Sequence, residues 1–325
     1  MIESLKKYIM NKIIKSQANF PINNTKTKKF KFLNDLPSYK IFSFGNKNKN
    51  LIFYVIKIDG PGGGLFANML YVLQHLKVAK RFNFIPVVDM ENYYGLYNEK
   101  NKVFGQSNAW EYYFKQVSNY TLKEVYESRN VILGTGFFSK SMVRSYKEDS
   151  DLKEIFLRNV KIKEKFIKNA ENFIKKNIHI NSTLGVQIRG TNFRTTPLHP
   201  MPPSIDQIFY TIDKAMKLQK LKKIFLVTDQ QSYLEEFKKK YGSKLCFRDS
   251  VRANTGRIFH IIKNKNHRYN LGIDAIEEML IISKLKFLIC SRSNVSEVAI
   301  MISKKKINFF EMNNGFNSSR FLYAQ

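Results

Sequence analysis

Cysteine is scarce in this sequence. Cys246 and Cys290 are its two cysteines in 325 residues, and no Cys-x-x-Cys pair occurs. Without that spacing the chain carries neither a zinc-ribbon motif nor the disulfide framework of a small secreted domain. We expect both side chains to be ordinary buried thiols, which suits a reducing compartment.

Long apolar runs are also missing. No run approaches the ~20 residues that span a bilayer, and the N-terminal segment lacks an apolar core followed by a small-residue cleavage site. We therefore expect a cytoplasmic protein. Residues 1–15 nevertheless mix Ile and Leu with lysines, as a basic amphipathic helix does. Such a helix either contacts the inner face of the cell membrane peripherally or packs on its own domain.

Acidic residues are few compared with basic ones. The sequence has 26 Asp plus Glu against 55 Lys plus Arg, which gives a net charge of +29. This excess suits nucleic acid, anionic lipid or phosphorylated substrates, but it also arises when lysines simply cover solvated faces. Because no RNP sequence, zinc finger or helix-turn-helix signature appears, a nucleic-acid-binding protein is the weaker alternative.

Strand and helix patterns alternate along most of the chain. Apolar, β-branched runs predict strands, and apolar residues at helical spacing between them predict helices. The predicted strands are 51–59, 85–90 and one from residue 131 in the first half, and those from residues 185, 224, 244, 287 and 307 in the second. The predicted helices are 65–80, a long basic one over 151–176, and 205–220, 232–241 and 274–285.

This alternation predicts an α/β protein with parallel strands, because a helix that joins two strands returns the chain to the same edge of the sheet. The length favours two domains. We expect a basic N-terminal extension over residues 1–50, an N-terminal α/β domain over 51–176, and a C-terminal Rossmann-like domain over 177–325. The two α/β halves are expected to face a central cleft.

Residues 60–68 read GPGGGLFAN, a glycine turn that follows the first predicted strand and opens a helix. Its backbone N–H groups suit an anion, and a plain tight turn explains the glycines equally well. The Lys and Ser/Thr of a Walker motif are absent, and the glycines do not fit the Gly-x-Gly-x-x-Gly register. The sequence therefore gives no support for a P-loop or a dinucleotide site.

Three further places lie directly after predicted strands, where ligands gather in open α/β sheets. Arg189 can hold phosphate oxygens bidentately with its planar guanidinium, or it ties a loop to a carboxylate. Asp229 can accept hydrogen bonds from sugar hydroxyls, although the pattern favours a helix cap. Residues 291–296, rich in serine, form either an anion cradle or the cap of the next helix.

Taken in order, these places resemble the GT-B fucosyltransferases, a superfamily that includes α-1,6-fucosyltransferases, nodulation fucosyltransferases and protein O-fucosyltransferases. The segment GVQIRGTNF is similar to the family's His-x-Arg-x-x-Asp signature, so Arg189 matches its key arginine. Two positions depart from the family: Gln187 replaces the usual His and Asn192 the usual Asp. The further matching positions are Gly62, Gly63, Gly64 and Asn68, Thr228 and Asp229, Glu278, and Ser293, Asn294 and Val295.

The resemblance implies a GT-B fold and an inverting transferase that uses a GDP-sugar donor, GDP-fucose being the family expectation, with no obligatory metal or other cofactor. It implies that the matching residues of the C-terminal domain, together with Gly62, Gly63, Gly64 and Asn68, bind the donor, and that the N-terminal domain forms the acceptor side. The acceptor would be a glycan or a bacterial surface polysaccharide. Another nucleotide-sugar donor and an inactive, lectin-like relative remain alternatives, the latter because of Gln187 and Asn192.

A direct displacement needs a base that takes the proton of the acceptor hydroxyl. The loop 195–203 contains no Asp or Glu, and His199 is its titratable side chain. His199 is therefore the candidate base, or a loop histidine that packs or contacts the acceptor. Asp89 and Glu91 are the alternatives on the acceptor side. Trp110, with Tyr112 nearby, offers an aromatic face for stacking on a sugar, or belongs to the core.

Overall fold

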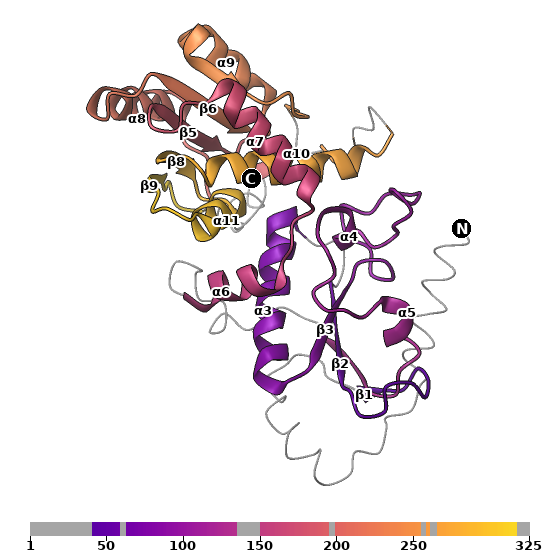
Figure 1. Ribbon diagram of the computed structural model, residues 1–325. Coiled ribbons are helices and arrows are strands. Elements are labelled where there is room, and N and C mark those ends of the chain that lie inside the picture. The colour runs from indigo at the N-terminus through magenta and orange to yellow at the C-terminus, as the bar shows by residue number, and fades with distance from the viewer. Residues whose placement is uncertain are drawn as a thin grey trace, which may run out of the picture. The chain divides into compact units, whose positions relative to one another are not determined.

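The computed structural model of the chain describes residues 41–58, 63–134, 150–194, 199–254, 258–260 and 265–316. The chain divides into two compact units, Met1–Lys163 and Glu164–Gln325. Each unit is built on its own sheet (Figure 1). The predicted amphipathic helix over residues 1–15 lies outside the described residues.

The first unit has a four-stranded sheet in the order β1-β4-β2-β3. Its three parallel strands confirm the sequence prediction, and an antiparallel strand is added at one edge from a region that we expected to lie outside the domain. The strands are β1 (Ile41–Phe42), β2 (Phe53–Lys57), β3 (Ile85–Asp89) and β4 (Val131–Gly134). The first unit therefore begins its sheet before residue 51.

A long helix, α3 (Leu65–Phe82), connects β2 to β3. It ends at Asn83, whose φ of 54° lies in the left-handed region and whose N–H bonds the carbonyl of Lys80. Asn is one of the few residues that adopt this conformation at low cost, so the helix stops there. Two short helices follow, α4 (Trp110–Tyr113) and α5 (Leu122–Val125).

The long helix predicted over 151–176 is wrong: the chain forms two helices, α6 (Ser150–Asn159) and α7 (Glu164–Asn177). Between them the backbone leaves helical geometry to bond the first unit. Lys115 N–H donates to the Lys161 carbonyl, and Lys163 N–H donates to the Tyr113 carbonyl, both over 2.9 Å. These bonds replace the helical ones, which explains the break.

Helix α7 belongs to the second unit, so the division of the chain falls between Lys163 and Glu164 rather than after residue 176. The ring of Phe173 on α7 lies 5.7 Å from that of Phe225, a residue of the second sheet. Asn169, also on α7, donates to Glu277 over 2.8 Å.

The second unit has a five-stranded, fully parallel sheet in the order β7-β6-β5-β8-β9. All five strands confirm the sequence prediction, and helices separate them as in a Rossmann-like fold. The strands are β5 (Thr183–Ile188), β6 (Lys223–Thr228), β7 (Leu245–Phe247), β8 (Phe287–Ser291) and β9 (Asn308–Met312). The helices are α8 (Ile205–Leu218), α9 (Gln231–Tyr241), α10 (His267–Ile282) and α11 (Asn294–Ile302), with 3-10 turns η2 (Thr191–Arg194) and η3 (Gly242–Lys244).

Side-chain alternation along β6 shows how the second sheet is covered on both faces. Ile224 and Leu226 pack with residues of α8 and α9, such as Ile212 and Phe237, in one buried cluster. Phe225, between them, points to the opposite face and meets α7. A strand buried on both faces reads as a continuous apolar run, which is why the sequence pattern predicts it well.

Cys290 is buried on β8, and Cys246 is half-buried on β7; both thiols are free. The prediction of buried thiols is confirmed for the first and holds in part for the second. Among the described residues, no helix combines the length and apolar character needed to cross a membrane.

Candidate functional site

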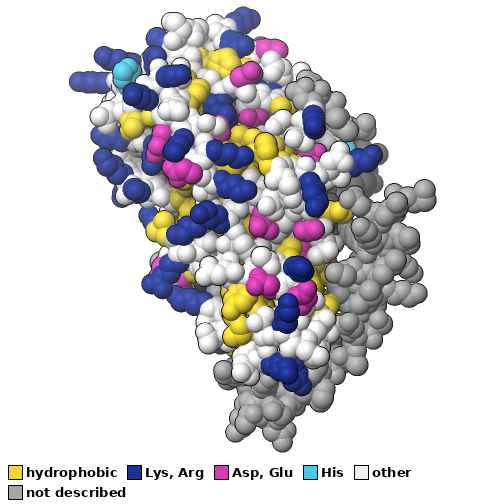
Figure 2. All heavy atoms as spheres, turned by 45° about the vertical axis from the view of Figure 1, so that its right-hand side comes forward, with side chains coloured by type: hydrophobic (Ala, Val, Ile, Leu, Met, Phe, Trp, Pro, Cys, Tyr) yellow, Lys and Arg dark blue, Asp and Glu magenta, His cyan; other side chains and the backbone are white. Residues whose placement is uncertain are grey.

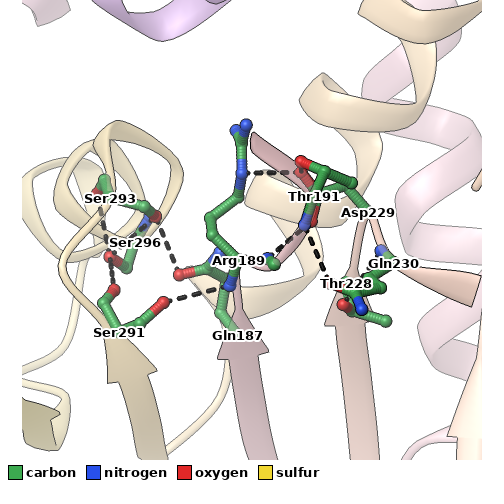
Figure 3. A network of polar contacts seen from close by, with 10 residues as sticks. Gln187, Arg189, Thr191, Thr228, Asp229, Gln230, Ser291, Ser293 and Ser296 are labelled. Atoms are coloured by element: carbon green, nitrogen blue, oxygen red, sulfur yellow. Dashed lines mark hydrogen bonds and ion pairs between the residues drawn. The ribbon is translucent and has the colours of Figure 1, made fainter. Parts of the chain in front are cut away.

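The strand order of the second sheet reverses between β5 and β8. Chain connections run outward to β6 and β7 on one side and to β9 on the other. In open parallel sheets, ligands bind at the carboxyl ends of the strands at such a point of reversal, here β5 and β8. Two hydrogen bonds join these ends (Figure 3). Arg189 N–H donates to Ser291 Oγ over 3.0 Å, and Ser293 Oγ donates to Gln187 Oε1 over 2.8 Å.

Arg189 lies at the middle of this edge. Its Nε is 2.8 Å from Asp229 Oδ2, and its guanidinium lies over the Phe193 ring at 4.6 Å from the centroid. The two terminal nitrogens point beyond the strand ends, away from the residues drawn around them (Figure 3). Asp229 thus pairs with Nε and leaves the two terminal guanidinium nitrogens directed outward.

Asp229 does not cap helix α9, contrary to the reading that its sequence pattern favours. The cap position is Gln230, whose side chain accepts no hydrogen bond from the backbone of the first turn. Instead the carboxylate turns toward the end of β5: Oδ1 accepts from Gly190 N–H over 3.0 Å, and Oδ2 accepts from Thr191 Oγ over 2.9 Å. Both oxygens are therefore engaged in shaping the turn that carries Arg189.

The turn after β5 is also tightly packed. Gln230 Oε1 accepts from Thr191 N–H over 2.8 Å, and Thr191 itself has a φ of 32°. A Cβ at Gly190 would lie 1.8 Å from Gln230 Oε1. Only glycine fits at this position without displacing Gln230 from its hydrogen bond.

The start of helix α11 completes the site. Ser293 occupies the cap position and accepts from Ser296 N–H over 3.3 Å, which confirms the capping interpretation of the serines. Asn294 and Val295 are the first two helical residues, and their backbone N–H groups have no hydrogen-bond partner within the described part of the chain. Free N–H groups and the positive end of the helix dipole suit an anion here.

Glu278 lies on α10, buried, and accepts from Ser250 Oγ over 2.8 Å. Burial raises the pKa of its carboxyl group to about 7. The segment after β7, which carries Ser250, links this residue to the site, because Ala253 N–H donates to the Asp229 carbonyl over 3.1 Å. Near it Arg248 pairs with Asp274 and Glu277.

His199 packs against the same ring as Arg189. Its imidazole meets Phe193 edge-on, with centroids 4.8 Å apart. Arg189 and His199 thus both contact the Phe193 ring, and Phe193 is a site residue that sequence reasoning missed. An aromatic side chain four positions after the arginine was the available signal. The side chain of Asn192 lies outside the described residues.

The candidate residues of the first unit take mainly structural roles. Gly63 N–H donates to Asn68 Oδ1 over 2.9 Å, as in a tight turn before α3; Gly64 precedes that helix directly, and Gly62 lies outside the described residues. Asp89, fully buried, accepts from the N–H groups of Glu91 and Asn92, from the Asn92 amide and from Tyr126 OH.

Glu91 is the exposed carboxylate beside this turn. Partial burial of its carboxyl group, with the charge of Asp89 as a smaller contribution, raises its pKa. Among the acidic candidates of the first unit, Glu91 therefore has the side chain that is open to a ligand.

Trp110 is part of the core of the first unit, so the sugar-stacking interpretation is wrong for this residue. Its side chain is 2% exposed, its Nε1–H donates to the Lys115 carbonyl over 3.0 Å, and its ring lies 4.4 Å from that of Phe114. Tyr112 is buried as well. The pattern could not separate an aromatic face in solvent from one in the interior.

Within the described ranges, no group of three or more His, Cys, Asp or Glu side chains is arranged to hold a metal ion. No protein-family model matches the sequence, and no curated protein matches it. Similarity appears at the level of structure.

The NodZ α-1,6-fucosyltransferase, in a crystal soaked with GDP-fucose, matches with a TM-score of 0.50 and 13% sequence identity, covering 79% of this chain and 95% of NodZ. POFUT1 in complex with GDP-fucose matches with a TM-score of 0.49 and 10% identity, covering 82% and 99%. A variant of Arabidopsis thaliana FUT1 with GDP matches with a TM-score of 0.45 and 12% identity, covering 90% and 76%. The likeness to NodZ confirms the predicted fold class: the chain has an α/β, GT-B fucosyltransferase-like fold.

Proposed function

We propose that this chain is a glycosyltransferase that uses a nucleotide-diphosphate sugar, GDP-fucose in the first instance, and binds the donor diphosphate at the carboxyl ends of β5 and β8. The observation that carries the proposal is the Arg189 side chain. Its Nε is held by Asp229, and its terminal nitrogens point outward beyond the strand ends.

This arrangement suits a departing diphosphate. Negative charge grows on the leaving phosphate as the bond to the sugar breaks, and a fixed guanidinium neutralises that charge without rearranging. The N–H groups of Asn294 and Val295 offer a second set of donors to the same phosphates. The fold shared with NodZ, whose crystal was soaked with GDP-fucose, supports a GDP-sugar as the donor.

His199 is the proposed base in an inverting displacement. It packs on the Phe193 ring, which the Arg189 guanidinium also contacts, so one ring positions both functional groups. A neutral imidazole can take the proton of an acceptor hydroxyl near neutral pH. We take the acceptor to be a glycan or a bacterial surface polysaccharide, modified on the cytoplasmic side of the membrane.

Glu278 bears on the choice of nucleotide. Its carboxyl group faces Ser250 and lies next to the segment that bonds Asp229. A carboxylate accepts hydrogen bonds from the N–H groups of guanine, whereas uracil and cytosine offer different donor patterns. Nucleotide-sugar donors with a base other than guanine are the second candidate. Nucleotide-binding measurements are needed to identify the base.

The experiment is a thermal-shift panel of GDP, UDP, CMP and their sugars on the wild type, Arg189→Ala and Arg158→Ala. Arg158 is a matched control, since it is an exposed arginine of the first unit paired with Glu154. At a ligand concentration of 100 times Kd, binding adds about 2.7 kcal/mol to the stability of the folded state. We expect GDP to stabilise the wild type and the control, and Arg189→Ala to lose the response.

A chain that responds to no nucleotide would contradict the proposal, and more so if it bound plain RNA instead. A chain that binds GDP but neither hydrolyses nor transfers the sugar would be an inactive relative. In that case Gln187→His and Asn192→Asp, which restore the residues usual in the family, are the first substitutions to test.

A further inference from the structure

The edge of the second sheet opposite the candidate site is lined with lysine. Because all five strands are parallel, the connections that lead from each helix into the next strand lie together at the amino ends of the strands. Taken together with the last residues of α7, α8 and α9, each of these five segments carries two or more lysines and no Asp, Glu or Arg. They are residues 175–182, 217–223, 238–244, 283–286 and 303–307.

Most of these lysines are exposed. Within the described part of the chain, Lys240 alone among them forms an ion pair, with Asp213 over 2.8 Å. The negative end of each helix dipole favours lysines in a last turn. It does not account for lysines beyond the helix end, such as Lys222, Lys286 and Lys304. Figure 2 shows Lys and Arg side chains spread over the face that it presents, with fewer acidic ones among them.

Exposed aliphatic side chains accompany the lysines. Ile180 is 41% exposed in the connection into β5, and Leu218 is 67% exposed in the connection into β6. These two connections are neighbours, because Lys222 N–H donates to the Ser182 carbonyl over 2.8 Å. Two large apolar side chains therefore project from adjacent parts of the basic edge.

We propose that this lysine edge is a docking surface for an anionic phospholipid bilayer. Lysines attract the negatively charged surface, and isolated aliphatic side chains enter the interface between head groups and acyl chains. A nucleic-acid surface fits less well, since the five segments contain no arginine and their exposed ring is the small imidazole of His179 rather than a Phe, Tyr or Trp. The proposal is independent of the transferase activity.

The test uses flotation of the full chain with vesicles of phosphatidylcholine alone or mixed with phosphatidylglycerol. The variant combines Lys217→Gln, Lys220→Gln and Lys222→Gln. A matched control combines Lys100→Gln, Lys102→Gln and Lys123→Gln, three exposed lysines of the first unit. Each lysine near an anionic surface contributes about 1 kcal/mol, so we expect the variant to bind mixed vesicles at least about tenfold more weakly and the control to bind as the wild type does.

A second variant, Leu218→Ser, separates a bilayer from other polyanions. We expect it to weaken binding to mixed vesicles and to leave binding to heparin unchanged. Melting temperatures of all variants check that they are folded. Equal vesicle binding by the two lysine variants would overturn the proposal, and so would a loss of RNA binding without any loss of vesicle binding.

Discussion

Arg189 and Asp229 form an ion pair that joins two adjacent strands, with Nε 2.8 Å from Oδ2. The same carboxylate accepts from Gly190 and Thr191, so one side chain fixes both the backbone of the turn and the charge that it presents. Asp229 is therefore a positioning residue in the proposed site rather than a group that must touch the ligand.

Asp229→Asn is expected to weaken GDP binding about fivefold and to lower stability by no more than about 1 kcal/mol. The amide keeps the shape and can still accept from Gly190 N–H, but it removes the charge that orients the guanidinium. Partly exposed ion pairs of this kind are worth about 1 kcal/mol, which corresponds to about a fivefold change in affinity. Isothermal titration with GDP measures the effect. Asp206→Asn, at the exposed start of α8, is the control; unchanged affinity in Asp229→Asn would contradict the positioning role.

Glu278→Gln is expected to remove part of the pH dependence of stability. The folded chain keeps the Glu278 proton up to about pH 7, against a usual pKa of 4.5, because the carboxyl group is buried. The folded state thus binds more protons than the unfolded one in this window. The wild type loses the corresponding stability as pH rises from about 4.5 through 7.

The variant should therefore gain stability relative to the wild type between pH 5 and 8, by up to about 3 kcal/mol. Urea unfolding at several pH values measures the difference. Glu236→Gln, on the exposed side of α9, should show no such trend. A constant difference between Glu278→Gln and the wild type across this range would show that the buried group does not titrate there.

Trp110→Ala is expected to destabilise the protein by about 3–5 kcal/mol, as truncation of a buried aromatic side chain does. Trp110→Phe should cost less, because it keeps most of the contact with Phe114. Urea unfolding gives both values. A rise in acceptor KM in Trp110→Phe at unchanged stability would instead place this ring in the acceptor site.

A fragment of residues 164–325 is expected to unfold cooperatively, whereas a fragment of residues 177–325 is not. The longer fragment keeps α7, whose Phe173 and Asn169 contact Phe225 and Glu277. The shorter one exposes that face of the sheet. Circular dichroism during thermal unfolding compares them, and equal cooperativity would mean that α7 is dispensable for the second unit.

The sequence predicted the elements better than the contacts between them. Strands such as β6 are buried on both faces, so their apolar runs are visible without any knowledge of neighbours. The break between α6 and α7 was not visible, because it depends on backbone bonds from Lys161 and Lys163 to a distant segment. The helical spacing of apolar residues in the sequence continues through the break without interruption.

Side-chain roles were the least predictable part of the site. The position of Arg189 at a strand end followed from the pattern, but an Asp after a strand looks the same whether it caps a helix or reaches sideways to the next strand. Asp229 does the second, and the choice is made by the pairing of β5 with β6. Trp110 posed the same problem, since burial is decided by packing.

The stacked and paired Arg189 side chain has a consequence for selectivity. Immobilising a long side chain on binding costs about 0.5–1.5 kcal/mol, and here Asp229 and Phe193 restrict the arginine during folding. A guanidinium whose plane is fixed favours ligands with two oxygens spaced to accept from its two terminal nitrogens. Planar or tetrahedral oxyanions should therefore compete for this position far better than spherical ions such as chloride, at any given charge.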